Sequence, residues 1–302
     1  MNPIQHLITQ RTSKISEGFE VGRLLPYRRQ RMVGPFIFFD HMGPVELAAG
    51  QAGKLDVLAH PHIGLATVTY LFSGAMTHRD SMDSLQEIRP GEVNWMVAGR
   101  GITHSERLET LNNMGGNLHG LQTWVALPEE LEESAPSFTH YAGEEQLPVW
   151  QDQHKHYRLL AGRYAGMESA VVTQSPLFYL HLQLSLGAVE QVPKEYPERA
   201  VFVVQGRIQL GEQTMEAGQM AILVPQADAR FSALQDSSVV IIGGEPLGER
   251  YLDWNFVSSS PERLRQARDA WLHGEMELPR DEQMFEPYPP ALLKLRSRPA
   301  RS

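Results

Sequence analysis

The 302-residue sequence contains no cysteine. Disulfide bonds, thiolate zinc sites, iron–sulfur clusters and cysteine nucleophiles are thereby excluded, so any metal ion must be held by histidine and carboxylate ligands. The lack of cysteine also fits a reducing compartment.

Long hydrophobic runs are absent as well. No apolar stretch reaches the roughly 18 residues that a membrane-spanning helix needs. The first residues, MNPIQHLITQRTSKISEGF, lack the apolar core of a secretion signal. We therefore expect a cytoplasmic protein that does not span a membrane.

Positive charge is scarce. There are 27 lysines and arginines against 36 acidic residues, which gives a formal net charge of −9. Binding to DNA gains much of its free energy from lysine and arginine contacts to phosphates, so this balance disfavours a direct nucleic-acid partner. With 42% hydrophobic and 21% charged residues, the composition is that of an ordinary globular protein, and its length suggests two domains.

Short runs rich in β-branched and aromatic residues recur through both halves of the chain, separated by glycine and proline. The first half contains FIFFD, ATVTYLFSG, VNWMVAG and LQTWVAL, and the second contains FYLHLQLSLG, RAVFVVQGRIQLG and SSVVIIGGEP. This pattern is typical of a β-sandwich or barrel. A polar stretch at 128–156 separates the two halves, and we expect it to cross between two β domains.

One helix is predicted, near the C-terminus. Ser260 is a suitable N-cap, Pro261 fits the first turn, and the amphipathic run that follows closes on Gly274. We expect the proline-rich tail beyond it to be extended or mobile.

Two histidine-containing pairs carry the chemistry. His60 and His62 form the motif HPH just before a β-branched run, and His104 and Glu106 form HSE after a glycine-rich turn. In a strand, residues i and i+2 leave the same face about 6 to 7 Å apart. A lone HxH is more often an accident of the surface. Two such pairs on neighbouring strands would place four donors around one point, and burying them without a partner would cost several kcal/mol.

These four residues therefore predict one divalent metal ion per chain. Three imidazoles and a carboxylate suit Fe(2+), with Mn, Ni, Cu and Zn as alternatives. An octahedral ion would keep two positions open for water, dioxygen or substrate. A closed tetrahedral zinc site with the same ligands would be structural instead.

The same motifs resemble the pirin family of the cupin superfamily, in its bacterial form. The resemblance is close over 36–128 and weaker over about 11–290. It rests on VGPFIFFDHMGP, HPHIGLATVTYLFSG, HRDS, RPGEVNWMVAGRGITHSER and GLQTWVALP. It implies an all-β bicupin fold of two tandem jelly-roll-like β-barrels with a short C-terminal helix. We expect a metal-binding cupin domain at 1–135 and a degenerate cupin domain with the helix and tail at 136–302.

The resemblance implies that His60, His62, His104 and Glu106 bind the metal, typically iron. It also implies two kinds of function. Some pirins are quercetin 2,3-dioxygenases, oxidoreductases that open a flavonol with O2 and release carbon monoxide, and Glu106 would then be the catalytic base. The alternative is a non-enzymatic, redox-sensing regulator that acts through a protein partner, and a purely structural metal is a third reading. The family favours a monomer.

Two departures from the family pattern concern the surroundings of the metal and the second barrel. Ile63, Leu65 and Ala66 replace the Arg, Phe and Glu of the frequent string HPHRGFETVTY, which changes the charge beside the site. In the second half no histidine pair precedes the corresponding strand, and Arg230 stands where a metal-binding cupin places a histidine. We expect that barrel to be metal-free.

Three further histidines lie in the region of close resemblance, namely His41, His78 and His119. We expect them to serve packing. The alternative is that they line the pocket or orient the ligands from behind.

Overall fold

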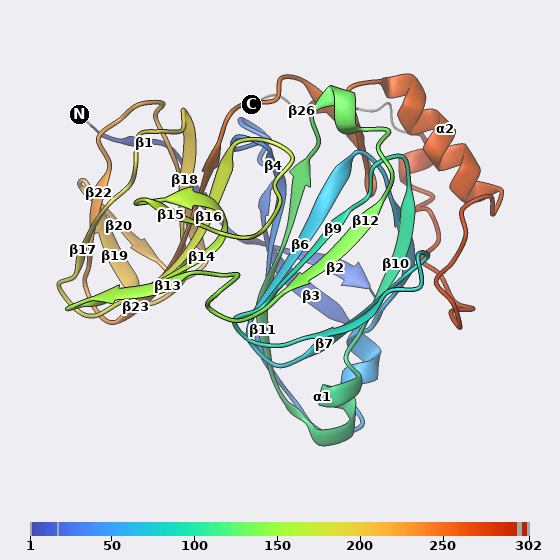
Figure 1. Cartoon of the computed structure of the whole chain (residues 1–302), viewed down its shortest axis with the longest axis horizontal. Helices are drawn as coiled ribbons and strands as arrows, with labels where there is room; N and C mark the ends of the chain where they lie inside the picture. Colours follow the sequence, from blue (N-terminus) through green and yellow to red (C-terminus); the bar gives the residue numbers. More distant parts are fainter. Residues whose placement is uncertain (1, 17, 295–297, 301–302) are drawn as a thin grey trace.

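The computed structural model describes residues 2–16, 18–294 and 298–300. Figure 1 shows two β-barrels side by side, with α2 on the outer side of the first barrel, far from the second. The predicted all-β fold with two β-barrels and a short C-terminal helix is therefore confirmed.

The first barrel is built from a seven-stranded and a four-stranded antiparallel sheet. In spatial order the larger sheet contains β12 (Ser137–Tyr141), β9 (Val93–Val97), β6 (Leu65–Ser73), β11 (Gly116–Ala126), β4 (Phe36–Leu47), β3 (Phe19–Leu25) and β2 (Arg11–Ser16). The smaller sheet contains β5 (Val57–His62), β10 (Ile102–Arg107), β7 (Met76–Asp80) and β8 (Leu85–Ile88). Phe19 and Leu71 of the larger sheet share a buried cluster with Met76 and Ile88 of the smaller one, which holds the two sheets together.

The second barrel repeats this plan. Its larger sheet contains β1 (Ile4–Thr9), β21 (Gln219–Leu223), β18 (Glu198–Gln205), β23 (Ser237–Gly244), β16 (Leu177–Leu184), β14 (Lys155–Tyr164) and β13 (Val149–Asp152), with β15 (Met167–Glu168) paired to β14. Its smaller sheet contains β17 (Val189–Gln191), β22 (Arg230–Ala233), β19 (Arg207–Leu210) and β20 (Gln213–Glu216). Apolar side chains from both sheets, such as Leu180, Val201 and Phe231, fill its interior.

The predicted helix is α2 (Pro261–Leu272). The Ser260 hydroxyl accepts a hydrogen bond from the Arg263 amide, as an N-cap should, and the helix buries Leu264 and Trp271 against Ile63 of the first barrel. The remaining elements are α1 (Glu109–Met114), the 3-10 helices η1 (Ala52–Leu55), η2 (Glu129–Leu131) and η3 (Leu292–Lys294), and a small sheet of β25 (Phe256–Ser258), β24 (Arg250–Asp253) and β26 (Arg298–Ala300). Among the described residues, no helix is both long and apolar enough to cross a membrane.

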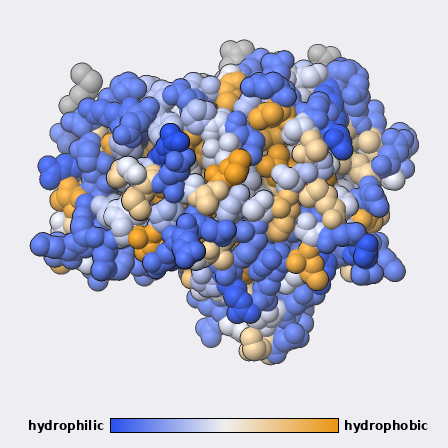
Figure 2. Space-filling model, in the orientation of Figure 1, coloured by the Kyte–Doolittle hydropathy of each residue, from blue (hydrophilic) through white to orange (hydrophobic). Residues whose placement is uncertain are grey.

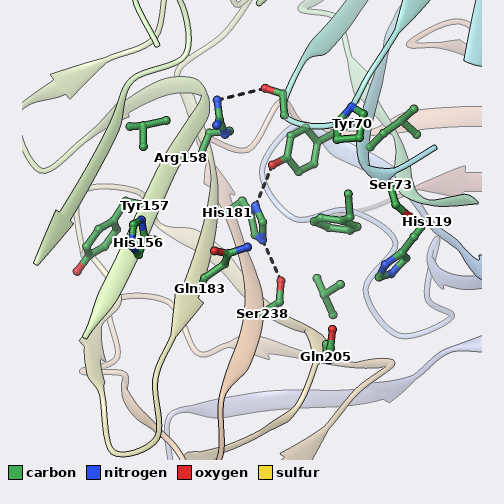
Figure 3. A pocket seen from close by; sticks show the side chains of 16 residues that line it. Tyr70, Ser73, His119, His156, Tyr157, Arg158, His181, Gln183, Gln205 and Ser238 are labelled. Carbon is green, nitrogen blue, oxygen red and sulfur yellow. Dashed lines mark hydrogen bonds between the residues drawn. The ribbon is translucent and has the colours of Figure 1, made fainter. Parts of the chain in front are cut away.

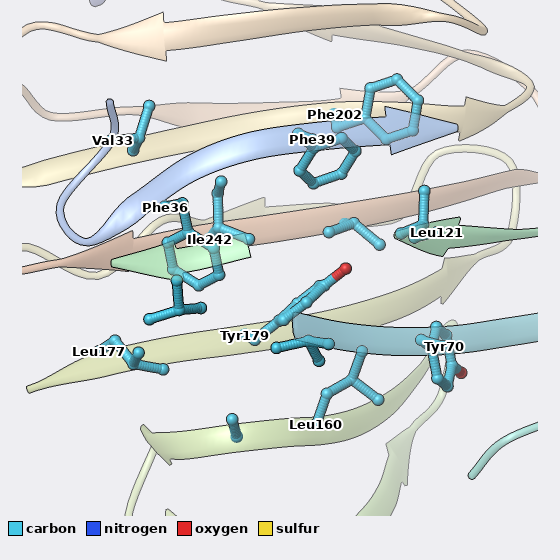
Figure 4. Packing of buried hydrophobic residues seen from close by; sticks show 14 of the residues in the cluster. Val33, Phe36, Phe39, Tyr70, Leu121, Leu160, Leu177, Tyr179, Phe202 and Ile242 are labelled. Atoms are coloured by element: carbon cyan, nitrogen blue, oxygen red, sulfur yellow. The ribbon is translucent and has the colours of Figure 1, made fainter. Parts of the chain in front are cut away.

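One buried apolar cluster joins the two barrels. It contains side chains from the larger sheet of each barrel, as Figure 4 shows. Phe36 meets Tyr179 edge to face at 5.6 Å between ring centroids, and Phe39 meets Phe202 in the same way at 5.1 Å. Such contacts add to the free energy gained from removing these rings from water. The two barrels therefore share a continuous core.

The chain passes between the barrels more than once. The first strand, β1, pairs with β21 of the second barrel before the chain builds the first. The polar stretch at 128–156 makes the expected crossover, because β12 pairs with β9 and β13 pairs with β14. The expected division into 1–135 and 136–302 stays a prediction.

The face of the molecule seen in Figure 2 is covered mostly by hydrophilic residues. Hydrophobic residues on that face lie in small groups between them. Scattered apolar side chains of this kind are normal on soluble domains.

A pair of histidines lies at the boundary between the barrels. The Nε2 atoms of His41 and His119 are 2.8 Å apart, and His41 also packs edge to face on Phe202 of the second barrel. Burial lowers the pKa of His41 to about 4, with a smaller contribution from His119. His41 is therefore neutral in the folded protein at pH 7.

The stability of the fold should depend on this histidine below pH 6.5. The folded-state pKa of His41, about 4, lies below its ordinary value of 6.5. The contribution of neutral His41 to the free energy of unfolding is therefore complete above pH 6.5 and is lost as the pH falls toward 4. One such group contributes a slope of about 1.4 kcal/mol per pH unit. We expect His41→Gln to reduce the slope of the unfolding free energy by about this amount, measured by urea denaturation. Substitution of the exposed His273 by Gln is the matched control and should keep the wild-type slope.

Candidate metal centre

Strand pairing brings three histidines together inside the first barrel. His60 and His62 lie on β5, and His104 on the antiparallel neighbour β10 is directly opposite His60. Alternation along the strand puts all three side chains on the inner face. The ring centroids are 4.3 to 5.0 Å apart, and one nitrogen of each ring lies within 4.8 Å of the other two. All three residues are buried. We call this group the histidine triad.

Backbone carbonyls fix two of the rings from behind. The Nδ1 atom of His60 donates to the Leu58 carbonyl at 2.8 Å, and the Nδ1 atom of His62 donates to the Asn255 carbonyl at 3.0 Å. A carbonyl oxygen only accepts, so both rings carry their proton on Nδ1 and leave Nε2 as a lone pair. Within the described part of the chain, the buried Nε2 atoms of His62 and His104 have no hydrogen-bond partner.

A hydrogen-bonded chain holds the third ring. The Nδ1 atoms of His104 and His78 are 3.4 Å apart, and His78 Nε2 donates to Asp80 at 3.0 Å. Asp80 in turn accepts hydrogen bonds from the amides of Met82 and Ser84 at 2.9 and 3.0 Å. Since His78 donates through Nε2, its Nδ1 accepts the proton of His104, which again leaves His104 Nε2 unprotonated.

The triad is neutral in this environment. Burial is the main reason that the pKa of His60 is lowered to about 4 and that the pKa values of His62 and His104 are lowered well below the ordinary range. Neutral imidazole is the form that binds metal ions. Three lone pairs that converge in a buried place without a proton need a cation, so these residues fit one metal ion.

Glu106 lies two residues beyond His104 on the same strand. The register of β10 with β5 shifts at this point through an extra residue on β5, whereas the pairing of β10 with β7 stays regular through both residues. The carboxylate accepts a hydrogen bond from Gln122 at 3.1 Å, and Gln122 accepts one from Thr69 at 2.7 Å. Burial raises the pKa of Glu106 to about 7, although the hydrogen bond from Gln122 opposes the shift. The carboxylate is not part of the group of mutually close nitrogens, so its predicted role as fourth ligand stays a prediction.

A cavity of about 400 Å³ opens beside the triad, and both His60 and Glu106 line it. One wall is aromatic. Phe38 and Trp124 stack at 4.0 Å between ring centroids, and Trp124 meets the ring of His62 at 5.1 Å. A planar, largely apolar molecule fits such a wall.

An ion pair between the partly buried Arg23 and the buried Asp40 supports this wall. The guanidinium of Arg23 lies 4.4 Å from the centre of the Phe38 ring and makes two hydrogen bonds of 2.8 Å to Asp40. Lys14 also lines the cavity. The lining therefore includes two basic side chains, one of them held in place by a carboxylate.

The segment after the second barrel returns to form the opposite wall, which includes Trp254, Asn255 and Glu286. The Glu286 amide donates to the Ala59 carbonyl at 2.8 Å, and Trp271 Nε1 donates to the Glu286 carbonyl at 3.2 Å. These bonds tie the described part of the tail to the first barrel, and the tail includes the 3-10 helix η3 besides irregular segments. Residues 295–297 and 301–302 of the tail lie outside the described residues.

Asp80 and Asn255 were not identified from the sequence, whereas His78, His41 and His119 were named there. His78 takes the alternative position behind a ligand, whereas His41 and His119 lie at the boundary between the barrels. The motif HRD could have predicted the pairing of His78 with Asp80, because these residues alternate on one strand in the same way as the HPH pair. Asn255 gave no signal, because its contact with the triad is made through a backbone carbonyl.

Asp80→Asn should weaken metal binding. The amide group can donate toward His78 and so reverse its tautomer, which places a proton on the nitrogen that faces His104. Loss of such a supporting partner typically lowers metal affinity about 10- to 100-fold. Competition for Co(2+) between the metal-free protein and a chelating indicator measures the change.

The matched control is Asp83→Asn. Asp83 lies in the following turn, is exposed, and pairs with Arg280 instead of a histidine. This variant should bind Co(2+) like the wild type. Equal affinities for all three proteins would contradict a role of Asp80 in holding the triad.

Comparison with known proteins finds relatives that match most of this chain. A pirin-like protein of Caulobacter vibrioides is 51% identical over 261 residues, which cover 86% of this chain and 91% of the relative. A Pseudomonas aeruginosa protein provisionally named as a quercetin 2,3-dioxygenase is 37% identical over 89% of this chain and 84% of its own. The crystal structure of a quercetin 2,3-dioxygenase from Acinetobacter baumannii has a TM-score of 0.87, with 32% identity and 97% of each chain covered.

Two family models match separate parts of the sequence. Residues 18–125, which contain the histidine triad and Glu106, match the model described as Pirin. Residues 179–277 match the model of the Pirin C-terminal cupin domain. Together with the extent and identity of the relatives, these matches show that the chain belongs to the pirin family.

Proposed function

We propose that this chain is a metal-dependent dioxygenase of the quercetin 2,3-dioxygenase type, which opens the ring of a flavonol with O2. The observation that carries the proposal is the neutral histidine triad, whose free nitrogens converge beside a cavity of about 400 Å³. A cavity of this size suits a small organic molecule. The similar structure from Acinetobacter baumannii, which bears this activity in its name, supports the assignment.

In this proposal one iron(II) ion is held by His60, His62, His104 and Glu106. A donor set of imidazole and carboxylate without thiolate suits non-haem iron(II). When bound, the ion supplies the Lewis acidity that lowers the pKa of a substrate hydroxyl, and the redox capacity needed for a reaction with O2.

Glu106 is proposed as the base that accepts the proton of the flavonol hydroxyl. Burial raises the pKa of Glu106 to about 7 in the metal-free chain, so the carboxylate takes up a proton readily there. As a ligand of the ion it would be labile, and it would accept the substrate proton when free of the metal. Gln122 donates to one carboxylate oxygen and is itself fixed by Thr69, so the carboxylate is oriented before substrate arrives.

The walls of the cavity are proposed to position a planar, anionic substrate. The stacked rings of Phe38 and Trp124 offer apolar surface to a flavonol ring system. Lys14 and Arg23, which line the cavity, favour the deprotonated form of the substrate over the neutral form. Removal of the hydroxyl proton by Glu106 and recognition of the resulting anion thus use different residues.

The reaction consumes one O2 and releases one carbon monoxide for each flavonol cleaved. We expect the protein, loaded with Fe(II) under anaerobic conditions, to take up O2 and release CO in equal amounts when quercetin and air are added. Elemental analysis should give one iron per chain. Iron at that level with neither O2 uptake nor CO release would contradict the proposed activity on quercetin.

Glu106→Gln should abolish most of the turnover while the histidine triad still binds iron. Loss of a general base typically costs about 10²- to 10⁴-fold in rate. Glu109→Gln is the matched control, because Glu109 is exposed on α1 and pairs with Arg79. Full activity of an iron-loaded Glu106→Gln protein would show that another group accepts the proton.

A further inference from the structure

A second cavity, of about 470 Å³, lies between the two barrels and shares no lining residue with the metal cavity. We call it the interbarrel cleft (Figure 3). The first barrel contributes residues of β6 and β11, and the second contributes residues of β14, β16, β18 and β23. Its volume falls in the usual range for sites that bind small molecules, about 300 to 1,000 Å³.

A hydrogen-bonded chain across the barrels forms the centre of the cleft. His181 of the second barrel meets the Tyr70 hydroxyl of the first at 2.8 Å through Nδ1, and the Ser238 hydroxyl at 2.8 Å through Nε2. Figure 3 shows the three side chains in a row. His181 and Tyr70 are buried, so this part of the cleft is fixed without a ligand.

The charge of the cleft differs from that of the whole chain. Although the protein has a formal net charge of −9, the described residues that line the cleft include no aspartate or glutamate. Arg158 supplies a positive charge there and is half-buried. Its guanidinium donates to the Gly91 carbonyl at 3.3 Å, and within the described ranges it forms no ion pair with a carboxylate. Asp236, in the adjoining hollow, is bonded to the Leu186 amide. The cleft therefore favours an anionic group beside Arg158.

His119 provides an acceptor elsewhere in the cleft. His41 donates through Nδ1 to the Gln10 side-chain oxygen at 3.1 Å, so its Nε2 accepts a proton from His119 Nε2 at 2.8 Å. His119 then keeps its proton on Nε2 and leaves Nδ1 as a lone pair. Figure 3 shows Arg158 and His119 on opposite sides of the cleft, with His181 between them. A ligand that spans the cleft would meet a cation at one end and a hydrogen-bond acceptor at the other.

The space between these two groups is partly apolar, since Phe72, Val149 and Val204 also line it. We propose that the interbarrel cleft binds a small hydroxylated aromatic carboxylate, with the carboxylate on Arg158 and a phenolic hydroxyl donating to His119 Nδ1. The ring lies against the apolar residues. This site is independent of the metal centre and of the reaction proposed for it.

The test is calorimetric titration of the full-length, metal-free protein with 4-hydroxybenzoate, and with 4-hydroxybenzamide as its neutral analogue. We expect saturable binding of the acid to one site and binding of the amide weaker by about tenfold or more, because the charge-assisted contact is lost. Arg158→Gln should weaken binding of the acid to a similar extent. Arg163→Gln is the matched control on the same strand, since Arg163 is exposed and pairs with Glu168.

A second variant distinguishes weaker binding from a loss of folding. Gln183 lines the cleft and is exposed, so Gln183→Glu adds a negative charge there with almost no change of shape. It should also weaken binding of the acid, with a melting temperature like that of the wild type. Lys14→Gln, in the metal cavity, should leave binding unchanged. Absence of binding, or binding that depends on Lys14 instead of Arg158, would overturn the proposal.

Discussion

The position of one proton on each of three buried imidazoles is the constraint on which the metal centre depends. His60 and His62 give their Nδ1 protons to backbone carbonyls, and His104 gives its proton to His78. The remaining nitrogens are lone pairs that face one another in a buried place. The electrostatic repulsion among these buried lone pairs would be relieved by a cation. The architecture around the triad serves to keep these protons where they are.

Local patterns in the sequence predicted the parts of the structure that depend on local geometry. Strand alternation was enough to place His60 and His62 on one face, and the Ser260–Pro261 pair was enough to place the start of α2. The same alternation put Glu106 on the face of His104, and the regular pairing of β10 with β7 through both residues agrees with this. Spacing could not give the hydrogen bond that Glu106 accepts from Gln122 of β11, nor the separation of the carboxylate from the three mutually close imidazole nitrogens.

Contacts between distant parts of the chain could not be predicted in this way. The carbonyl that orients His62 belongs to Asn255, and the shared core joins Phe36 to Tyr179 across the two barrels. A backbone acceptor can belong to any residue type, and an apolar residue suits any core. Neither kind of contact can therefore be predicted from a sequence motif. The interbarrel cleft is defined by the packing of the two barrels, so it has no sequence motif either.

The hydrogen bond from His62 to Asn255 also sets an order of events during protein synthesis. The motif HPH emerges from the ribosome early, but the carbonyl that fixes its second histidine is made 193 residues later. Until then the first barrel lacks one wall of the cavity and the acceptor that selects the metal-binding tautomer of His62. A newly made N-terminal half thus carries all three histidines in an immature arrangement. The arrangement of the three histidine side chains is therefore completed only when the segment that carries Asn255 docks on the first barrel.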